Sequence, residues 1–238
     1  MDVAFLVPGR LEPLTGGSLY NRFLAEALAR RGHRVSLHPL PVRPRIRLLL
    51  ENFRVRSWRR CSPEAGGVVI VDGLIREGLL LPLRFGRRPR GARVALLHQL
   101  CPPPPAGGAA CRSSEKAFLS RMGAALCPGE ILAAEVTRRT GGRLTVHPAP
   151  PGGDRLGRAP NEDFIRRRAC APGALELLFV GNLSPVKGLP PLLSALADLP
   201  PALWRLTVVG SLSFDPAAAR AARRAADRFG LGDRVRFR

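Results

Sequence analysis

Short apolar runs alternate with helical patterns along most of this 238-residue chain. A strand, a crossover helix and a second strand wind into a parallel sheet that helices cover on both faces, so the alternation predicts an α/β fold. The first helix is expected over residues 18–31, with Gly32 as its C-terminal cap. In the first part of the chain the expected strands cover residues 3–7, 35–37, 68–71, 94–97, 124–127 and 144–147.

A segment rich in Pro, Gly and Arg separates this alternation from a second one. We interpret residues 156–173 as a linker with one short helix, because they show no strong period. Beyond it, strands are expected over 175–180, 205–209 and 234–237, and helices over 189–199 and 216–229. Three strands and two helices make half of a doubly wound domain. The sequence therefore predicts two Rossmann-like parallel-sheet domains, over 1–155 and 174–238, of which the second is incomplete.

The formal net charge of +20 raises the question of a nucleic-acid or membrane partner, because a basic surface attracts phosphate. However, all of the 38 basic residues except Lys116 and Lys187 are arginine, and Ala, Pro and Gly are also abundant. This composition indicates a codon bias rather than a binding surface. Aromatic residues make up 5% of the chain and do not cluster with the arginines, as they do in single-strand binders. We predict no nucleic-acid binding.

The cysteines are odd in number, widely spaced and form no CxxC pair, so the sequence predicts neither a disulfide nor a metal site. They are Cys61, Cys101, Cys111, Cys127 and Cys170. The N-terminal apolar run is interrupted by Pro8 and Arg10, and no uncharged apolar run reaches the roughly 18 residues that a membrane span needs. We therefore expect a cytoplasmic protein that is soluble or bound peripherally to a membrane.

Two glycines precede the first helix in the segment LTGGSLYN. Gly16 and Gly17 would let backbone amides approach a ligand, and the start of a helix favours an anion or a hydroxyl-rich group. The alternative is an ordinary tight turn in which Ser18 caps the helix. The GxGxxG pattern of dinucleotide-binding proteins is absent.

A second candidate loop, in the segment FVGNLSPVKGL, follows a buried strand. It contains Gly181, Asn182 and Lys187. Since the chain otherwise uses Arg, Lys187 indicates a need for a compact, flexible ammonium group, and phosphate is the natural ligand. The alternative is a solvated charge in a loop. The spacing does not match the GxxxxGK of a phosphate-binding P-loop.

His98 is the third candidate, because it directly follows the apolar run 94–97. Open parallel sheets bind ligands at the carboxyl ends of their strands. A histidine in this position can donate a hydrogen bond to a sugar hydroxyl or orient a leaving group. The plainer alternative is that His98 caps a nearby backbone carbonyl.

These segments resemble the retaining glycosyltransferases of family 4, which have the two-lobed GT-B fold. The first lobe contributes LVPGRLEPLTGGSLYN, VVIVDGL, VALLHQL and SSEKAFL, and the second contributes GNLSPVKG, WRLTVVGS and LGDRVRF. The similarity covers nearly the whole chain. Its most specific part is GNLSPVKG together with the downstream VVG, which ends at Gly210.

The resemblance implies that the second lobe binds a nucleotide-diphosphate sugar as donor. Lys187 would bind the diphosphate, within a motif that also contains Gly181, Asn182 and Gly210. The family usually has Arg where this chain has Asn182, so one of two positive charges is absent. The acidic pair that holds the sugar and ribose hydroxyls in the family would lie beyond Arg238, so the chain resembles a fragment without a complete active site.

The resemblance also assigns roles to the first lobe. Gly16 and Gly17 would approach the sugar and the phosphates, and His98 would be catalytic, in contact with the transferred sugar. Transfer would retain the anomeric configuration, with the leaving phosphate as base and neither a metal nor a cofactor. The acceptor, a glycan, a lipid-linked molecule or a small molecule, is not specified.

Residues 43–60 indicate a different kind of function. They combine Leu, Phe, Val and Trp with seven arginines and could lie on an anionic membrane surface. The alternative is a helix that faces the core and keeps its arginines in solvent. A further alternative for the whole chain is a truncated, catalytically inactive protein.

Overall fold

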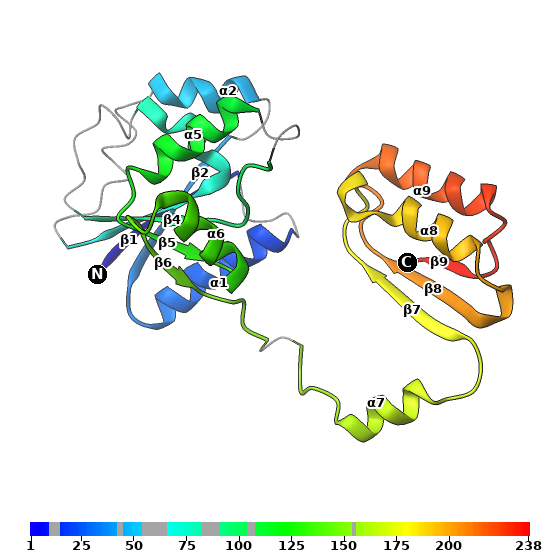
Figure 1. Ribbon diagram of the computed structural model, residues 1–238. Coiled ribbons are helices and arrows are strands. Elements are labelled where there is room, and N and C mark those ends of the chain that lie inside the picture. Colours follow the sequence, from blue (N-terminus) through cyan, green and yellow to red (C-terminus); the bar gives the residue numbers. More distant parts are fainter. Residues whose placement is uncertain (10–14, 42–44, 54–65, 82–90, 104–107, 154–155) are drawn as a thin grey trace. The chain divides into compact units, whose positions relative to one another are not determined.

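The computed structural model describes the chain except for residues 10–14, 42–44, 54–65, 82–90, 104–107 and 154–155 (Figure 1). It contains two compact units, Met1–Arg155 and Leu156–Arg238. Each unit has its own parallel sheet and its own hydrophobic core. The two parallel-sheet domains expected from the sequence are confirmed.

Unit 1, Met1–Arg155, is built on a six-stranded parallel sheet in the order β2-β1-β3-β4-β5-β6. The strands are β1 (Asp2–Pro8), β2 (Arg34–Leu40), β3 (Val68–Asp72), β4 (Ala92–Leu96), β5 (Ala124–Cys127) and β6 (Thr145–Pro148). The chain runs from β1 outward to β2 and then returns to the other side of β1 as β3. In doubly wound sheets, ligands bind where the strand order reverses in this way.

The central strand β1 is buried on both faces, which explains its uninterrupted apolar sequence. Val3, Phe5 and Val7 belong to one core cluster, with Ala25 of helix α1 (Gly16–Arg30). Leu6 belongs to the cluster on the opposite face. Successive side chains of a strand point to opposite faces, so one strand contributes to two cores.

Helix α1 begins earlier than the sequence predicted. Thr15 is its N-cap, and the Thr15 and Ser18 side chains form a reciprocal capping box, so both glycines lie in the first turn. The alternative in which Ser18 is the N-cap is therefore wrong, because Ser18 takes part in the capping box from the N3 position. At the other end, Gly32 has φ +83°, which fits its expected role in ending the helix.

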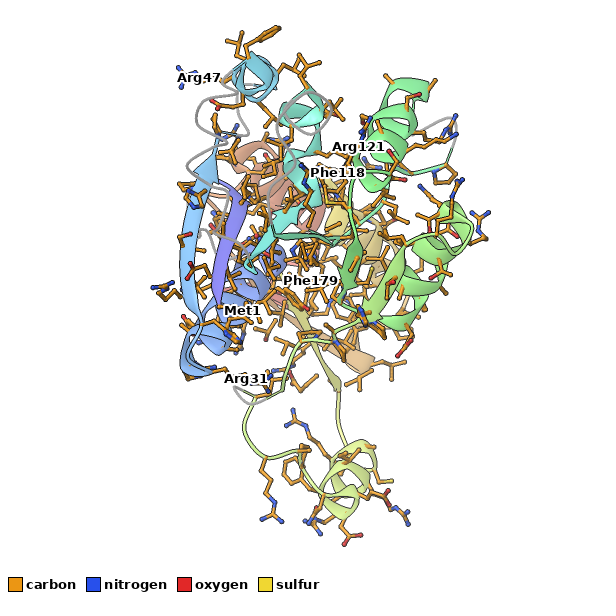
Figure 2. All side chains as sticks on the ribbon, turned by 90° about the vertical axis from the view of Figure 1, so that its left-hand side faces the viewer. Met1, Arg31, Arg47, Phe118, Arg121 and Phe179 are labelled. Atoms are coloured by element: carbon orange, nitrogen blue, oxygen red, sulfur yellow. A yellow bond between two sulfur atoms is a disulfide. The ribbon has the colours of Figure 1, made fainter. Side chains whose placement is uncertain are left out.

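The face of the sheet opposite α1 is covered by α5 (Ala109–Leu119), α6 (Glu130–Thr140), the short helix α2 (Arg45–Leu50) and the 3₁₀ turn η2 (Gly73–Gly78). A further 3₁₀ turn, η1 (Glu51–Phe53), follows α2. Phe118 of α5, labelled in Figure 2, is fully buried in this core. The helices α5 and α6 serve as the crossovers that parallel strands require.

Unit 2, Leu156–Arg238, contains a three-stranded parallel sheet in the order β7-β8-β9. The strands are β7 (Leu175–Val180), β8 (Trp204–Val209) and β9 (Val235–Phe237), and the helices are α7 (Glu162–Ala169), α8 (Leu189–Ala197) and α9 (Pro216–Arg228). Helices α8 and α9 cover one face of this sheet (Figure 1). The side chain of Trp204 is buried in the core that they share with the sheet. The 3₁₀ turns η3 (Pro185–Lys187) and η4 (Pro201–Leu203) complete the unit. Helix α7, which lies in the expected linker, buries none of its residues.

Gly210 marks a close approach between two strand ends of unit 2. A Cβ atom at this position would lie 1.9 Å from the carbonyl oxygen of Gly181. The two segments are joined by the hydrogen bond from the Gly181 N–H to the Val209 carbonyl, at 2.9 Å. Only glycine fits there without a shift of the backbone.

We therefore expect Gly210→Ala to destabilise unit 2 by roughly 1–3 kcal/mol, the usual cost of forcing an extra carbon into a packed site. Guanidinium denaturation followed by Trp204 fluorescence, in a Trp58→Phe background, measures this change. The control is Gly232→Ala, since nothing among the described residues lies within 4 Å of a Cβ at Gly232. Equal stability of the two variants would contradict the close approach.

Candidate functional site

Three polar side chains meet at the carboxyl ends of β3 and β4 in unit 1. Asp72 is the last residue of β3, His98 follows β4, and Asn21 comes from α1. The Asn21 amide nitrogen lies 2.6 Å from Asp72 Oδ2, and the Asn21 amide oxygen lies 2.8 Å from His98 Nε2. His98 Nε2 and Asp72 Oδ2 are 3.6 Å apart. The three groups thus form one connected cluster.

The direction of these hydrogen bonds follows from the chemistry of the groups. The Asp72 carboxylate can only accept, so the Asn21 NH₂ group donates to it and the amide oxygen must face His98. His98 therefore donates from Nε2. Within the described part of the chain, Nδ1 has no hydrogen-bond partner, which makes it the ring nitrogen available to a ligand. The partner of His98 Nε2 is a side chain, and no backbone carbonyl of the described residues accepts from His98, which contradicts the alternative of a backbone cap.

The burial of this cluster is unusual for polar residues. Asp72 and Asn21 are both 0% exposed. A buried carboxylate is costly unless hydrogen bonds compensate it. Asp72 has that compensation, because the Leu74 backbone N–H donates to Oδ1 at 2.8 Å while Asn21 donates to Oδ2. His98 is thus oriented by groups that solvent does not reach.

Gly17 and Tyr20 of α1 flank the imidazole ring. A Cβ atom at Gly17 would lie 3.4 Å from His98 Cδ2, so this glycine is within van der Waals contact distance of the imidazole ring. The Tyr20 ring packs edge-on against His98 with centroids 5.4 Å apart, and its hydroxyl donates to the Ala149 carbonyl at 2.6 Å. Gly16 lies beside Gly17, and no described atom comes within 4 Å of its Cβ position. The structure thus brings two of the predicted residues, Gly17 and His98, together.

The candidate loop of unit 2 follows β7. Its first residue, Gly181, supports the aliphatic part of Lys187: a Cβ at Gly181 would lie 3.6 Å from Lys187 Cε. Lys187 is exposed, and among the described residues no carboxylate forms an ion pair with it. The turn ends at Gly188, whose φ of +70° favours glycine. Asn182 is half-buried beside it. The loop therefore presents a cation at the carboxyl end of a strand.

The fold of this chain, which carries both candidate sites, was compared with the folds of known proteins. No protein-family model matches the sequence, and no curated protein matches it. Solved structures do. Sucrose-phosphate synthase from Thermosynechococcus elongatus is 18% identical with a TM-score of 0.72, over 100% of this chain and 70% of that chain. Anabaena HepE, solved with UDP and glucose, is 17% identical with a TM-score of 0.68. The match covers 100% of this chain and 68% of the HepE chain.

The chain has the GT-B fold. An Escherichia coli structure described as trehalose-6-phosphate bound with UDP-2-fluoro glucose supports the same assignment, at 12% identity and a TM-score of 0.65, over 100% of this chain and 73% of that one. The GT-B architecture accounts for two parallel-sheet units in one chain. At these identities the likeness concerns the fold, so membership of family 4 and retention of configuration stay predictions.

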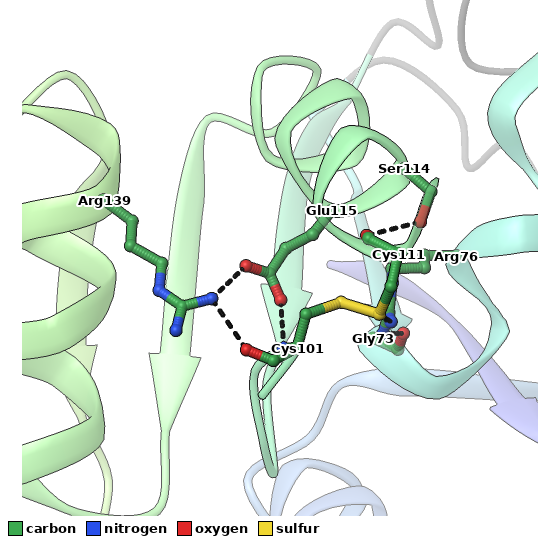
Figure 3. The surroundings of a disulfide bond; sticks show 7 residues. All are labelled: Gly73, Arg76, Cys101, Cys111, Ser114, Glu115 and Arg139. Atoms are coloured by element: carbon green, nitrogen blue, oxygen red, sulfur yellow. Dashed lines mark hydrogen bonds and ion pairs between the residues drawn. A yellow bond between two sulfur atoms is a disulfide. The ribbon is translucent and has the colours of Figure 1, made fainter. Parts of the chain in front are cut away.

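Cys101 and Cys111 form a disulfide, contrary to the prediction that all cysteines are free thiols (Figure 3). An odd cysteine count and wide spacing do not reveal which side chains a loop brings together. Cys127 is a buried free thiol, and burial raises its pKa to about 11. Cys170 is exposed. The disulfide ties the loop that follows His98 to helix α5.

Sequence reasoning missed Asn21 and Asp72 as members of the site. A signal for each was present. Asp72 ends the apolar run 68–71, and polar residues at the ends of parallel strands lie where ligands bind. Asn21 lies one helical turn after Gly17, on the stripe that continues with Ala25 and faces the sheet. A polar residue in an apolar stripe indicates a buried hydrogen bond.

The predicted membrane segment, 43–60, lies partly outside the described residues. In its described part, Leu48 is buried, whereas Leu49, Leu50 and Phe53 are 42%, 52% and 75% exposed. No helix in the described ranges has the length and apolar character to cross a bilayer. The same ranges hold no cluster of three His, Cys, Asp or Glu side chains that could bind a metal ion.

Tyr20, the only tyrosine of the sequence, should titrate above the normal range. Burial raises the pKa of Tyr20, and Cys127 nearby raises it further. The unfolded chain should lose this proton near the ordinary pKa of about 10. Neutral Tyr20 therefore contributes its full stabilisation of the native state below the ordinary pKa of about 10. That stabilisation is lost as the pH rises through the higher pKa of Tyr20 in the native state.

The measurement is the ultraviolet absorbance of tyrosinate, recorded against pH for native protein and for protein in guanidinium. The native midpoint should be the higher of the two, and Tyr20→Phe should remove the signal. A native midpoint at or below that of the unfolded chain would disprove the buried environment of Tyr20.

Proposed function

We propose that this chain is a glycosyltransferase that uses a nucleoside diphosphate sugar and transfers the sugar to an acceptor with retention, as in family 4. The observation that carries the proposal is the network from Asp72 through Asn21 to His98, which leaves Nδ1 of the imidazole for a ligand. This network lies next to the reversal of strand order, where doubly wound sheets bind ligands.

Lys187 is assigned to the donor diphosphate. Its ammonium is exposed, and its aliphatic part rests on Gly181. A cation there stabilises the negative charge that grows on the departing diphosphate. HepE has been solved with UDP and with UDP-glucose, which supports a UDP-sugar as the donor here. Because Asn182 supplies no charge, we expect weaker diphosphate binding than a pair of basic residues would give.

His98 is assigned to the transferred sugar. Since Nε2 donates to Asn21, neutral His98 can accept a hydrogen bond from a sugar hydroxyl at Nδ1. In the transfer step, the acceptor oxygen forms a bond to the anomeric carbon. The bond from that carbon to the diphosphate oxygen breaks, and its electron pair stays with the diphosphate. The acceptor proton passes to the departing phosphate, and Gly16 and Gly17 leave room for the sugar.

Two variants separate these roles. Lys187→Met keeps the length of the side chain and removes the charge, so we expect UDP-glucose affinity to fall roughly 10- to 100-fold, as for the loss of a charge-assisted hydrogen bond. His98→Ala should keep UDP affinity but lower the release of UDP from UDP-glucose by a similar factor. Calorimetry measures the affinities, and UDP release measures turnover without a known acceptor.

Arg224→Met is the matched control, because Arg224 is an exposed cation on α9. It should leave both quantities unchanged. The proposed function fails if the wild-type chain does not bind UDP-glucose, or if Lys187→Met binds it as tightly as the wild type does.

Peripheral membrane contact through 43–60 is a second proposal. The exposed apolar side chains of Leu49, Leu50 and Phe53 favour it, since the sequence places arginines on both sides of them. Apolar side chains that insert into the headgroup region, with basic residues beside them, bind anionic membranes.

The test is co-sedimentation with vesicles that contain phosphatidylglycerol. Arg43, Arg45 and Arg47 together, changed to Glu, should abolish pelleting, because each basic residue near an anionic surface contributes about 1 kcal/mol. The matched control changes Arg166, Arg167 and Arg168 of the exposed helix α7 to Glu. Pelleting that survives the first triple change, or that both triple changes abolish equally, contradicts the proposal.

A further inference from the structure

A hollow of about 760 Å³ lies between α5 and α6 of unit 1. The basic side chains among its lining residues are Arg112, Lys116, Arg138, Arg139 and Arg143, and the acidic one is Glu115. Arginine is common throughout this chain, so the charge by itself identifies no ligand. The shape of the hollow, its floor and its position relative to His98 are more specific.

The floor of the α5–α6 hollow is apolar. Leu119, Met122 and Leu144 line it and are 5%, 9% and 5% exposed. Pro102 and Pro103, which carry no backbone N–H, line it as well. A fully hydrated ion gains little from such a surface, whereas a ligand with an apolar part releases water from it. The hollow therefore suits a molecule that is partly apolar and partly anionic.

The residue before Pro102 is held firmly in place (Figure 3). The Cys101 N–H donates to Glu115 Oε2 at 2.6 Å, and the Cys101 carbonyl accepts from Arg139 Nη1 at 3.1 Å. The same Arg139 nitrogen donates to Glu115 Oε1 at 2.7 Å, and the disulfide joins Cys101 to Cys111. The charge of Glu115 is thus neutralised by Arg139. Lys116 and Arg143, which line the α5–α6 hollow, are exposed and have no acidic partner among the described residues.

A second hollow, of about 520 Å³, lies beside the α5–α6 hollow and reaches the candidate active site at His98. His98 and Leu100 line it, and it shares Pro102, Pro103 and Arg139 with the α5–α6 hollow. Ile131, which is 90% exposed, adds an apolar side chain to its lining. Because the two hollows share three lining residues, they adjoin, and together we call them the His98–Lys116 path.

We propose that this path binds the acceptor, and that the acceptor is an anionic amphiphile. Its hydroxyl lies at His98, its apolar part lies over Pro102, Pro103 and Leu119, and its acidic group, a phosphate or a carboxylate, lies at Lys116 and Arg143. This inference rests on the proposed function. The hydroxyl oxygen forms the new bond to the anomeric carbon and gives up its proton to the departing diphosphate, while the acidic group stays unchanged and only anchors the molecule.

The test uses octyl phosphate and octanoate as probes, with inorganic phosphate and octyl glucoside as the purely ionic and the uncharged comparisons. Calorimetry on the full chain should show that at least one acidic amphiphile binds more tightly than either comparison. Lys116→Glu and Arg143→Glu should each weaken that binding on the order of tenfold, as expected when an anion loses a charge-assisted contact. Whichever of octyl phosphate and octanoate binds more tightly indicates whether the acidic group of the acceptor is a phosphate or a carboxylate.

Arg31→Glu is the matched control, since Arg31 is an exposed arginine at the end of α1, outside both hollows. It should leave amphiphile binding unchanged. Affinity for UDP-glucose, measured on the same samples, should be unchanged in all three variants.

If UDP-glucose binds but the acidic amphiphiles bind no better than octyl glucoside, or are insensitive to both charge reversals, the acceptor inference is wrong while the proposed function stands. If UDP-glucose does not bind to the wild type, the proposed function fails and the acceptor assignment fails with it.

Discussion

The buried carboxylate of Asp72 is the interaction on which the geometry of the candidate site depends. A charge that is 0% exposed needs donors on both oxygens, and these come from the Leu74 N–H and the Asn21 amide. Asn21 belongs to α1, so the need to satisfy Asp72 fixes α1 against the end of β3. That position in turn brings Gly17 against His98. One electrostatic requirement thus sets the places of the helix, the glycine and the histidine together.

A second buried charge holds the other end of the His98 loop. Glu115 is 5% exposed and is paired with Arg139, and both also bind the backbone of Cys101. His98 therefore lies between two fixed points, the Asn21 contact on one side and Cys101 on the other. A loop with two such anchors needs little reorganisation to bind a ligand, which favours precise contacts. The same anchors shape the floor of the path toward α5 and α6.

Most of the strands could be predicted from sequence, because a buried parallel strand leaves an apolar run that local inspection finds. The run 175–180 coincides with β7 (Leu175–Val180), and 124–127 coincides with β5 (Ala124–Cys127). The strand expected over 35–37 extends over β2 (Arg34–Leu40) instead, although it includes His38 and Pro39. The strand is longer than predicted because β2 pairs with β1 along its full length. Pro39 is tolerated because β2 is an edge strand, and its outer side forms no hydrogen bonds to another strand of the sheet.

By itself, the sequence determined the α/β alternation, the two sheets, and the loops that carry Gly17, His98 and Lys187, because strand ends and helix starts are local features. The tertiary structure alone decided what surrounds them. Asn21 meets Asp72 across 51 residues and His98 across 77, and Arg139 meets Glu115 across 24. Such pairs follow from the order and register of the strands. These depend on the packing of the whole unit, and no single segment contains that information.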